Sequence, residues 1–481
     1  AITINYVDAG QLTLTMKDDS PTAIRGASDA FVVKPADFVL SAIKRTSDDF
    51  ANPGTAVDEN GAAFMAAGDD FSVTVTAVNA LGNVTPNYGQ ESAPESVLLT
   101  STLVAAGAAD NPAVGFTTGF DGFISGVDTG TDFHWDEVGI ITLSASVGDG
   151  DYLGVGDVSG TASSNVGRFF PDHFITAVTA GSFANTCATG TAFTYLGESF
   201  DYLSSPTVTA SAMSAHAHAP NLPLANYTGA WAKLTVAGVS LTYPTVDDTQ
   251  LDENGVLAIG VTSTAGMADR VDNGDGSLTF TLGATTADSF AYVRSAGQVA
   301  AFTADMTIEL TAVNDGEAAA SDLVAPRAIK PVGNQQRFGR ALAFDATSPD
   351  AVVGSSTLTM SVLPQYFSAG GWVTNTDDSC AIYAYSKVDS VITTTILPAS
   401  TVTFTAGAGD LVLTLTGDSG DLGGTSTVSF TWPSWLQYDI DSVDQPTLTP
   451  DGNFYDDDTS ATATFGSFQG DDRYLYWRES P

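Results

Sequence analysis

The residues of this sequence that could do chemistry are few, and its two cysteines, Cys187 and Cys380, stand out among them. Neither belongs to a Cys-x-x-Cys pair, so the pattern excludes a structural metal site of that kind. In a secreted protein, which matures in an oxidising compartment, one pair of cysteines predicts one disulfide. The alternative is that both are buried free thiols, which pack as small apolar side chains.

The histidines and the common catalytic motifs offer no further site. His216 and His218 alternate along a short segment, as two ligands of a metal would, but alanine flanks both and no acidic residue is near. An exposed loop is therefore the preferred interpretation. The sequence contains no Gly-x-Ser-x-Gly elbow, no His-Glu-x-x-His and no phosphate-binding glycine loop. We expect no catalytic residue and no enzymatic activity.

Calcium is the one cofactor that the residue pattern leaves open. Residues 269–276 form an acidic turn, but an EF-hand loop that began at Asp272 would place Gly274 and Gly283 at ligand positions. Other acidic clusters are Asp69-Asp70, Asp377-Asp378 and Asp456-Asp457-Asp458. Solvated hairpin turns also favour Asp, Asn and Gly, and this is the simpler interpretation. No metal ligand set is predicted.

The tryptophans could form flat platforms on which sugars stack, or they could fill the cores of β-sandwiches. The core is the preferred interpretation, because a strand usually buries such a large ring. Trp432 and Trp435, on either side of Pro433, are the exception and are expected on a loop. The six tryptophans are Trp135, Trp231, Trp372, Trp432, Trp435 and Trp477.

The charge of the chain excludes several classes of partner. The 481 residues include 56 acidic and 16 basic side chains, which gives a net charge of −40. Such a surface repels nucleic acid and anionic membranes, so neither is an expected partner. Hydrophobic residues make up 43% of the chain, which is enough to build cores and argues against a disordered tail. No apolar run approaches the ~20 residues that cross a bilayer, so no membrane insertion is expected.

The middle of the sequence contains an echo that indicates a tandem array of similar domains. The spacing drifts slowly, as it does when loops gain residues and the strands between them are kept. The repeated positions, with their spacing, are Phe64/Phe193, Gly68/Gly197 and Phe71/Phe200 (129), Pro35/Pro171 and Phe38/Phe174 (136), and Asn87/Asn226 and Tyr88/Tyr227 (139).

Alternation of apolar residues with Thr or Ser predicts strands almost everywhere, and no helical stripe is present. The fold class is therefore all-β, with tandem Ig-like antiparallel β-sandwich domains arranged end to end. The expected strands include 2–6, 11–16, 71–78, 140–145, 277–282, 306–310, 357–362 and 402–404.

Domain boundaries follow from the echo. Residues 1–35 resemble the last strands of an incomplete preceding unit, because Asp8-Ala9-Gly10 matches Glu137-Val138-Gly139. The first repeat is expected over 36–170, the second over 171–330 and a distinct C-terminal β-rich module over 331–481. The sequence begins without Met or a basic and apolar leader, so its N-terminus is expected to be processed or truncated. The predicted disulfide would join the second repeat to the C-terminal module.

Three stretches carry a resemblance to a known family: residues 166–174, the Asn-Thr-Asp-Asp-Ser-Cys segment that ends at Cys380, and residues 465–479. Together they resemble the C-terminal region of the MshQ family, which accompanies the mannose-sensitive haemagglutinin pilus of Gram-negative bacteria. The resemblance implies a large surface or pilus-associated protein with a role in adhesion. It supplies no catalytic residues.

Two functions are therefore expected for a non-enzymatic extracellular or cell-surface protein of a Gram-negative bacterium. The first is a pilus-associated adhesin or stalk, in which tandem sandwiches hold a binding region away from the cell. The second is a self-assembling filament subunit that exchanges strands between chains, because edge strands with unpaired backbone groups can pair with a neighbour. Expected partners are pilus or surface proteins, copies of the chain itself and a surface glycan.

Overall fold

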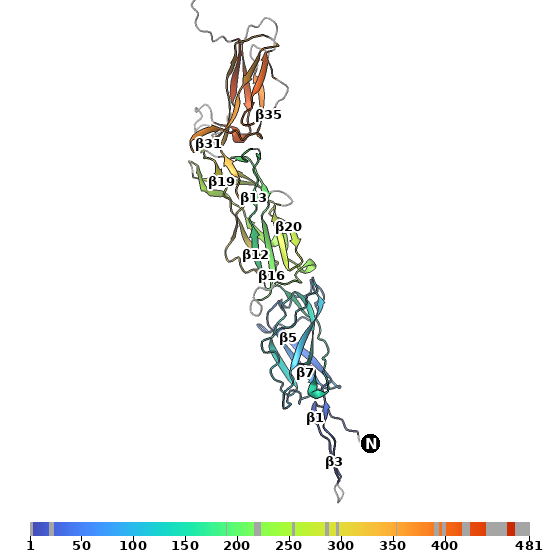
Figure 1. Cartoon of the computed structure of the whole chain (residues 1–481). Coiled ribbons are helices and arrows are strands. Elements are labelled where there is room, and N and C mark those ends of the chain that lie inside the picture. The colour runs from blue at the N-terminus through green and yellow to red at the C-terminus, as the bar shows by residue number, and fades with distance from the viewer. Residues whose placement is uncertain are drawn as a thin grey trace, which may run out of the picture.

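The protein is an elongated row of β-rich domains, seen in a computed structural model (Figure 1). The structure describes residues 3–18, 24–188, 190–215, 223–252, 255–283, 288–294, 298–352, 354–388, 394–396, 401–415, 424–438 and 459–466. Helical turns in these ranges are limited to four short 3-10 helices: η1 (Tyr152–Gly154), η2 (Gly229–Trp231), η3 (Val236–Gly238) and η4 (Ser434–Leu436). The predicted all-β class and tandem sandwich arrangement are confirmed.

A narrow ribbon of short strands forms the N-terminal end (Figure 1). β1 (Gly10–Leu12) pairs with β4 (Phe31–Val33), and β2 (Thr15–Lys17) pairs with β3 (Arg25–Ala27). The predicted strand 11–16 is divided between β1 and β2, and the described part of 2–6 forms no strand. The side chains of β2 and β3 are all exposed, so the alternating pattern of this segment faces no second sheet.

The first repeat is a sandwich of two sheets. One sheet has the strand order β5-β7-β9 and the other β6-β11-β10-β8, and β6 pairs with β11 in parallel. The predicted strands 71–78 and 140–145 are confirmed. The strands are β5 (Asp37–Arg45), β6 (Met65–Ala66), β7 (Phe71–Val78), β8 (Val97–Ala105), β9 (Val127–Phe133), β10 (Gly139–Val147) and β11 (Val166–Phe170).

Period-two alternation places the apolar side chains of this repeat between the two sheets. In β7, Phe71, Val73 and Val75 are fully buried, whereas Thr74 and Thr76 lie on the other face and are partly exposed. Each square ångström of apolar surface removed from water stabilises the fold by about 25 cal/mol. The sandwich is therefore held mainly by its buried aromatic and aliphatic residues.

The second repeat has two parts. The part next to the first repeat is a sandwich of the sheets β20-β21-β16-β12-β25 and β17-β24-β26, and the part beyond it has the sheets β13-β15, β18-β19-β22 and β14-β27-β23. Its strands are β12 (His173–Thr179), β13 (Ser182–Phe183), β14 (Thr194–Tyr195), β15 (Tyr202–Ser204), β16 (Thr207–Met213), β17 (Val239–Thr242), β18 (Val246–Asp252), β19 (Gly255–Ser263), β20 (Met267–Asp272), β21 (Ser277–Leu282), β22 (Ser289–Tyr292), β23 (Phe302–Thr303), β24 (Ile308–Val313), β25 (Ala319–Ala320), β26 (Arg327–Ile329) and β27 (Gln335–Arg337).

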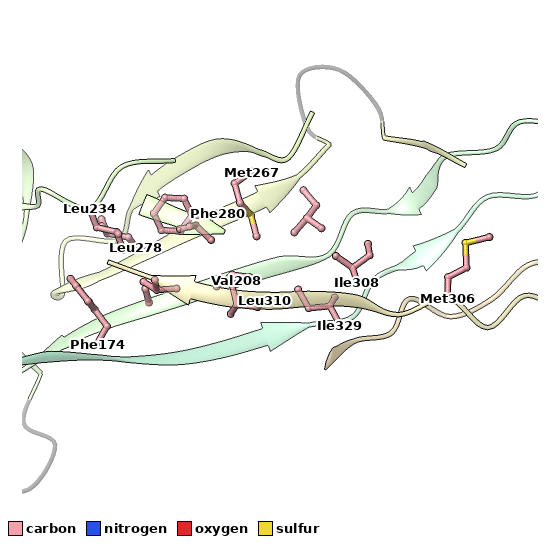
Figure 2. Close-up of a cluster of buried hydrophobic side chains, with 14 of the residues drawn as sticks. Phe174, Val208, Leu234, Met267, Leu278, Phe280, Met306, Ile308, Leu310 and Ile329 are labelled. Carbon is pink, nitrogen blue, oxygen red and sulfur yellow. The ribbon is translucent and has the colours of Figure 1, made fainter. Parts of the chain in front are cut away.

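Figure 2 shows the core between the two sheets of this sandwich. Phe174, Val208 and Phe280 face Leu310 and Ile329 from the opposite sheet, and all five are fully buried. The predicted strand 277–282 coincides with β21, while the predicted strand 306–310 begins only at Ile308.

The C-terminal module is also built from strands. Its sheets have the orders β28-β31-β32, β29-β38-β37-β33-β35 and β30-β36-β34. Trp432 lies outside a strand, as expected, on the connection between β37 (Gly424–Thr431) and η4, but its ring is buried and stacks on Phe430 with centroids 5.3 Å apart. The predicted strand 357–362 is divided between β30 and β31. The strands are β28 (Gly339–Ala343), β29 (Ala346–Ser348), β30 (Thr357–Met360), β31 (Val362–Ser368), β32 (Gly371–Thr374), β33 (Ile382–Val388), β34 (Thr394–Ile396), β35 (Thr401–Thr403), β36 (Leu411–Leu415), β37 (Gly424–Thr431) and β38 (Ser460–Phe465).

Very short connections join the domains. β11 leads to β12 through Pro171 and Asp172 alone, and β27 leads to β28 through Phe338 alone. Proline fixes its own φ and biases the preceding residue toward an extended conformation. The main chain therefore passes from each domain to the next with almost no linker, so the positions of the domains depend on their junctions.

Candidate functional site: the domain junctions

The acidic turn at Asp272, which could bind a cation, is occupied by the protein's own donors. Asp272 accepts hydrogen bonds from Thr228 Oγ1 and from the N–H groups of Gly229 and Gly274. Burial raises the pKa of Asp272, but the hydrogen bonds from Gly229 and Gly274 outweigh burial, and the pKa lies below its ordinary value. This carboxylate therefore closes a turn between β20 and the segment before η2.

Within the described ranges, no group of three or more His, Cys, Asp or Glu side chains is arranged to hold a metal ion. His216, His218, Trp477 and the Asp456–Asp458 cluster lie outside the described residues. The sequence-based interpretation of these segments stays a prediction.

Buried carboxylates in the second repeat are paired with tyrosines. Asp288 accepts hydrogen bonds from the hydroxyl groups of Tyr202 and Tyr243, at 3.0 and 2.8 Å, and Asp247 accepts one from Tyr292 at 2.6 Å. Burial, together with the neighbouring carboxylate, raises the pKa of each tyrosine above its ordinary value. These pairs satisfy buried polar groups of the fold, and none joins two candidate catalytic carboxylates.

Hydrogen bonds and ion pairs between residues far apart in the sequence concentrate instead at the boundaries between domains. At the boundary between the repeats, Asn226 is fully buried, and its side chain forms two hydrogen bonds with the backbone of Asp110 in the first repeat. Its Nδ2 donates to the Asp110 carbonyl at 2.7 Å, and its Oδ1 accepts from the Asp110 N–H at 3.1 Å. The amide thus pairs with the first repeat as a neighbouring strand would.

Glu137 completes this contact. Its Oε1 accepts hydrogen bonds from the N–H of Val138, at 2.8 Å, and from the N–H of Asn226, at 3.1 Å. Burial raises the pKa of Glu137 to about 7, although the bonds from Val138 and Asn226 act in the opposite direction. The loop that follows β8 also approaches the second repeat closely. A Cβ on Gly107 would lie 2.3 Å from the carbonyl oxygen of Thr228, so only glycine fits there.

An ion pair spans the same boundary. Arg168, in β11 of the first repeat, forms a two-pronged pair with Glu317 of the second repeat, and its Nη1 donates to Oε2 at 2.8 Å. Lys233 lies 3.5 Å from the same carboxylate. Burial raises the pKa of Glu317, but the hydrogen bond and the charge of Arg168 outweigh burial and hold that pKa below its ordinary value.

The apolar core also continues across the boundary. Ala56, Ala67, Val138 and Ile140 belong to the first repeat but pack into the buried cluster of the second repeat. The N–H of Ala215 donates to the carbonyl of Ala67 at 2.8 Å. The repeats therefore share core residues and cannot separate without exposing apolar surface to water.

The echo in the sequence reflects this junction. At the preceding boundary, the N–H of Asn87 donates to Asp8 Oδ1 at 3.0 Å, as that of Asn226 does to Glu137. The following tyrosines pack alike, Tyr88 on Phe38 at 5.2 Å and Tyr227 on Phe174 at 5.6 Å between ring centroids. Phe71 and Phe200 differ, because Phe71 lies in β7 whereas Phe200 forms only an isolated bridge with Phe290.

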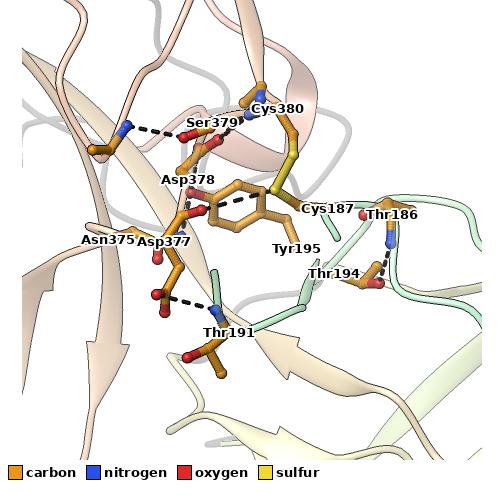
Figure 3. Close-up of a disulfide and its surroundings, with 12 residues drawn as sticks. Thr186, Cys187, Thr191, Thr194, Tyr195, Asn375, Asp377, Asp378, Ser379 and Cys380 are labelled. Carbon is orange, nitrogen blue, oxygen red and sulfur yellow. Dashed lines mark hydrogen bonds between the residues drawn. A yellow bond between two sulfur atoms is a disulfide. The ribbon is translucent and has the colours of Figure 1, made fainter. Parts of the chain in front are cut away.

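The second junction is covalent. Cys187 and Cys380 form the predicted disulfide between the second repeat and the C-terminal module (Figure 3). Their Cα atoms lie 5.6 Å apart, within the range that a disulfide requires. Cys187 pairs with Phe193 in a narrow turn, and both side chains pack into the core of the C-terminal module. The alternative of two free thiols is therefore excluded in this structure.

A buried arginine stands beside this bridge. Arg337 lies in β27, donates to Asn375 Oδ1, and pairs with Asp377 at 2.8 Å. Its guanidinium also stacks on the rings of Phe193 and Tyr366, at 4.5 and 4.6 Å. This arrangement is typical of arginine, whose planar group can donate and stack at once.

Tyr195 closes the cluster from the second repeat. Its hydroxyl donates to Asp378 Oδ2 at 2.8 Å and accepts from Asn375 Nδ2 at 2.7 Å (Figure 3). Burial raises the pKa of Tyr195 above its ordinary value, and the charge of Asp378 adds to this effect. The hydroxyl therefore stays protonated and keeps its role as a donor across the boundary.

Sequence reasoning found the disulfide but missed the other contacts. Arg168 and Glu317 are 149 positions apart, and Asn226 and Asp110 are 116 apart, so no local pattern joins them. One signal was available, since the Asn-Tyr echo marked the two asparagines. Only the three-dimensional arrangement of the domains shows that both asparagines contact the preceding unit.

These observations define a class of protein: a rod of tandem β-sandwich domains that share core residues and polar contacts at each boundary. Three domain models of one family match it in order, the second domain over residues 34–131, the third over 137–338 and the fourth over 337–480. The chain therefore belongs to the DUF6701 family. The third domain ends where β27 passes into β28, next to the disulfide-bridged junction.

Other comparisons add no function. Two states of an Escherichia coli alpha-2-macroglobulin, one activated by porcine elastase and one native, are 10% identical to the chain, with TM-scores of 0.15 and 0.14. They align with 95% of this chain, which covers 35% and 34% of theirs, and scores this low carry no structural argument. The comparison with curated proteins finds no match. No helix among the described residues is long and apolar enough to cross a membrane.

Proposed function

We propose that this chain is a non-enzymatic stalk of the cell surface, which holds a binding region away from the cell and carries tension along its length. The disulfide-bridged junction carries this proposal. A covalent bond between two domains keeps their boundary closed under load, and such bonds persist in oxidising, extracytoplasmic compartments. The near absence of linkers between the domains also suits a spacer.

The pilus-associated and adhesive role rests on the resemblance to the MshQ family. In this proposal the partners are pilus or surface proteins. The receptor class is a surface glycan, in keeping with the adhesive role that the resemblance implies. The net charge of −40 keeps such a rod soluble and separate from its neighbours.

Electron microscopy of the purified chain tests the stalk. Discrete, unbranched rods of uniform length are expected, whereas bent and variable chains of beads would contradict a rigid spacer. Glycan-array binding, with and without calcium, tests the adhesive role separately. Rods that bind no glycan would retain the stalk and remove the lectin activity from these residues.

The N-terminal ribbon favours a second candidate, a filament subunit. Apolar side chains of this ribbon line an open hollow of about 470 Å³, and they are Ile4, Tyr6, Leu12, Leu14, Phe31 and Val33. A second copy could cover this face by strand pairing. Fibres in the same micrographs, dispersed by the change Leu12→Asp with Phe31→Asp, would support the filament and count against the stalk.

A further inference from the structure

The junction between the repeats buries an ionisable group on the contact itself. Glu137 is 1% exposed, and its Oε1 joins the backbone N–H of Val138 in the first repeat to that of Asn226 in the second. Opening this boundary would return the carboxyl group to water. The equilibrium between closed and open junction is therefore linked to the protonation of one side chain.

The charges around Glu137 do not compensate for its burial. Asp110 is the charged residue that acts on it from the loop after β8, and it repels a carboxylate. On its own segment, His134 and Asp136 lie 3.7 Å apart and pair with each other. From the second repeat, the groups that donate to Glu137 are the neutral N–H groups of Ala225 and Asn226. The nearby cations of the boundary, Arg168 and Lys233, are engaged by Glu317.

We propose that the boundary between the two repeats is a pH-dependent hinge, closed when the Glu137 carboxyl is protonated and weakened when it ionises. A protonated carboxyl still accepts both backbone hydrogen bonds and does not have to be desolvated as an ion. The ionised form keeps the same bonds but must stay buried beside Asp110. The hinge does not depend on what the stalk binds, so it goes beyond the proposed function.

Linkage fixes the direction and the size of the effect. The pKa of Glu137 is about 7 in the closed junction, and in an open junction it returns to the ordinary value of 4.5. The closed junction therefore binds the proton more tightly, and its advantage is complete below pH 4.5 and decreases up to pH 7. Between pH 5.5 and 8 the ratio of closed to open junctions is expected to fall roughly 25-fold.

Amide hydrogen exchange measures this ratio directly on the whole chain. Peptides that contain Val138 and Asn226 report the junction, and a peptide from β16 reports the core of the second repeat as a reference. In the wild-type protein, the protection of the junction peptides relative to β16 is expected to fall about 25-fold from pH 5.5 to pH 8. In E137Q, whose amide oxygen accepts the same bonds without a charge, this relative protection should stay constant.

Two further variants keep the test decisive. Glu309→Gln changes an exposed glutamate of β24 and should behave as the wild type. Gly107→Ala drives a methyl group into the Thr228 carbonyl and should remove protection of the junction peptides at both pH values. If wild-type junction protection follows that of β16 across the whole pH range, the hinge is overturned, and this comparison holds even where E137Q does not fold.

Discussion

The junctions on either side of the second repeat share one feature and differ in another. Each uses an arginine from the last strand of the preceding domain, Arg168 in β11 and Arg337 in β27, and each arginine pairs with an acidic residue across the boundary. Both strands also pair in parallel with a short strand, β6 or β14. The difference is covalent, since only the second of these two junctions carries the disulfide between Cys187 and Cys380.

This difference indicates which junction of the rod opens first under tension. Tension along the chain acts equally on both junctions, but the first is held only by noncovalent contacts. Its central contact also includes the buried carboxyl of Glu137, whereas a bond between sulfur atoms does not titrate. The first junction is therefore expected to open before the second, and the following experiments break or sharpen that contrast.

The largest expected effect comes from removal of the disulfide by the paired change Cys187→Ala and Cys380→Ala. The bridge closes a loop of 193 residues, and the chain-entropy model assigns about 5 kcal/mol to such a crosslink. The free energy of unfolding of the C-terminal module should fall by that order in urea denaturation. The transition of the first repeat should not move, and reduction of the wild type with dithiothreitol should give the same result.

An unchanged transition of the C-terminal module would contradict the role of the bridge in that junction. It would also remove the contrast between the junctions, because Arg337 and its partners would then be sufficient. Mass spectrometry of the unreduced chain checks that the bond is present in the sample.

The next effect comes from the two arginines. Arg337→Met should cost about 3 kcal/mol, because it removes the guanidinium that donates to Asn375 Oδ1 and to Asp377 Oδ2 and that stacks on two rings. Arg168→Met should cost less, about 2 kcal/mol, because Lys233 remains beside Glu317.

Thermal unfolding of the two arginine variants measures both costs, with Lys44→Met as the matched control. Lys44 and Asp49 form an exposed ion pair, so the control should change stability by at most about 0.5 kcal/mol. Equal losses at Lys44 and Arg337 would mean that burial of the junction arginine adds nothing.

A smaller effect is expected from the asparagines of the echo. Asn226→Ala removes two hydrogen bonds with the Asp110 backbone in a buried site, and should cost about 2 kcal/mol. Asn87→Ala should cost less than about 1 kcal/mol, because its side chain binds Tyr6 at an exposed position. Differential scanning calorimetry of the two variants compares them, and a larger loss at Asn87 would reverse the assignment.

Much of the fold follows from local pattern. β7 and β21 appear at their predicted residues because alternate burial dictates a period of two, as in Phe71, Val73 and Val75. The disulfide was predictable from the single pair of cysteines together with the expected oxidising compartment. The predicted strand 2–6 was wrong for its described residues, because alternation alone does not supply a neighbouring strand to pair with.

The junction contacts could not be predicted in the same way. Arg168 can pair with Glu317 only after both sandwiches have folded and packed against each other. A sequence rich in carboxylates also offers many equivalent partners. Trp432 shows the same limit, because its neighbour Pro433 correctly indicated a loop but gave no sign of the packing against Phe430 that buries the ring. Long-range packing decides both cases.

The smallest predicted effect concerns acid and separates the junctions once more. The pKa of Glu317 is held below its ordinary value of 4.5 by Arg168, so the pair contributes stability above pH 4.5 and loses it as the pH falls further. Arg337 likewise outweighs burial and holds the pKa of Asp377 below its ordinary value, but there the disulfide keeps the boundary closed. Below pH 4.5 the first junction should therefore loosen while the second does not. Exchange of the Val138 peptide between pH 3 and pH 6 measures this in an E137Q background, where the opposite pH dependence of Glu137 is absent. The added change Glu317→Gln should then remove the acid dependence. An acid dependence that survives in this variant would assign it to a different carboxylate of the junction.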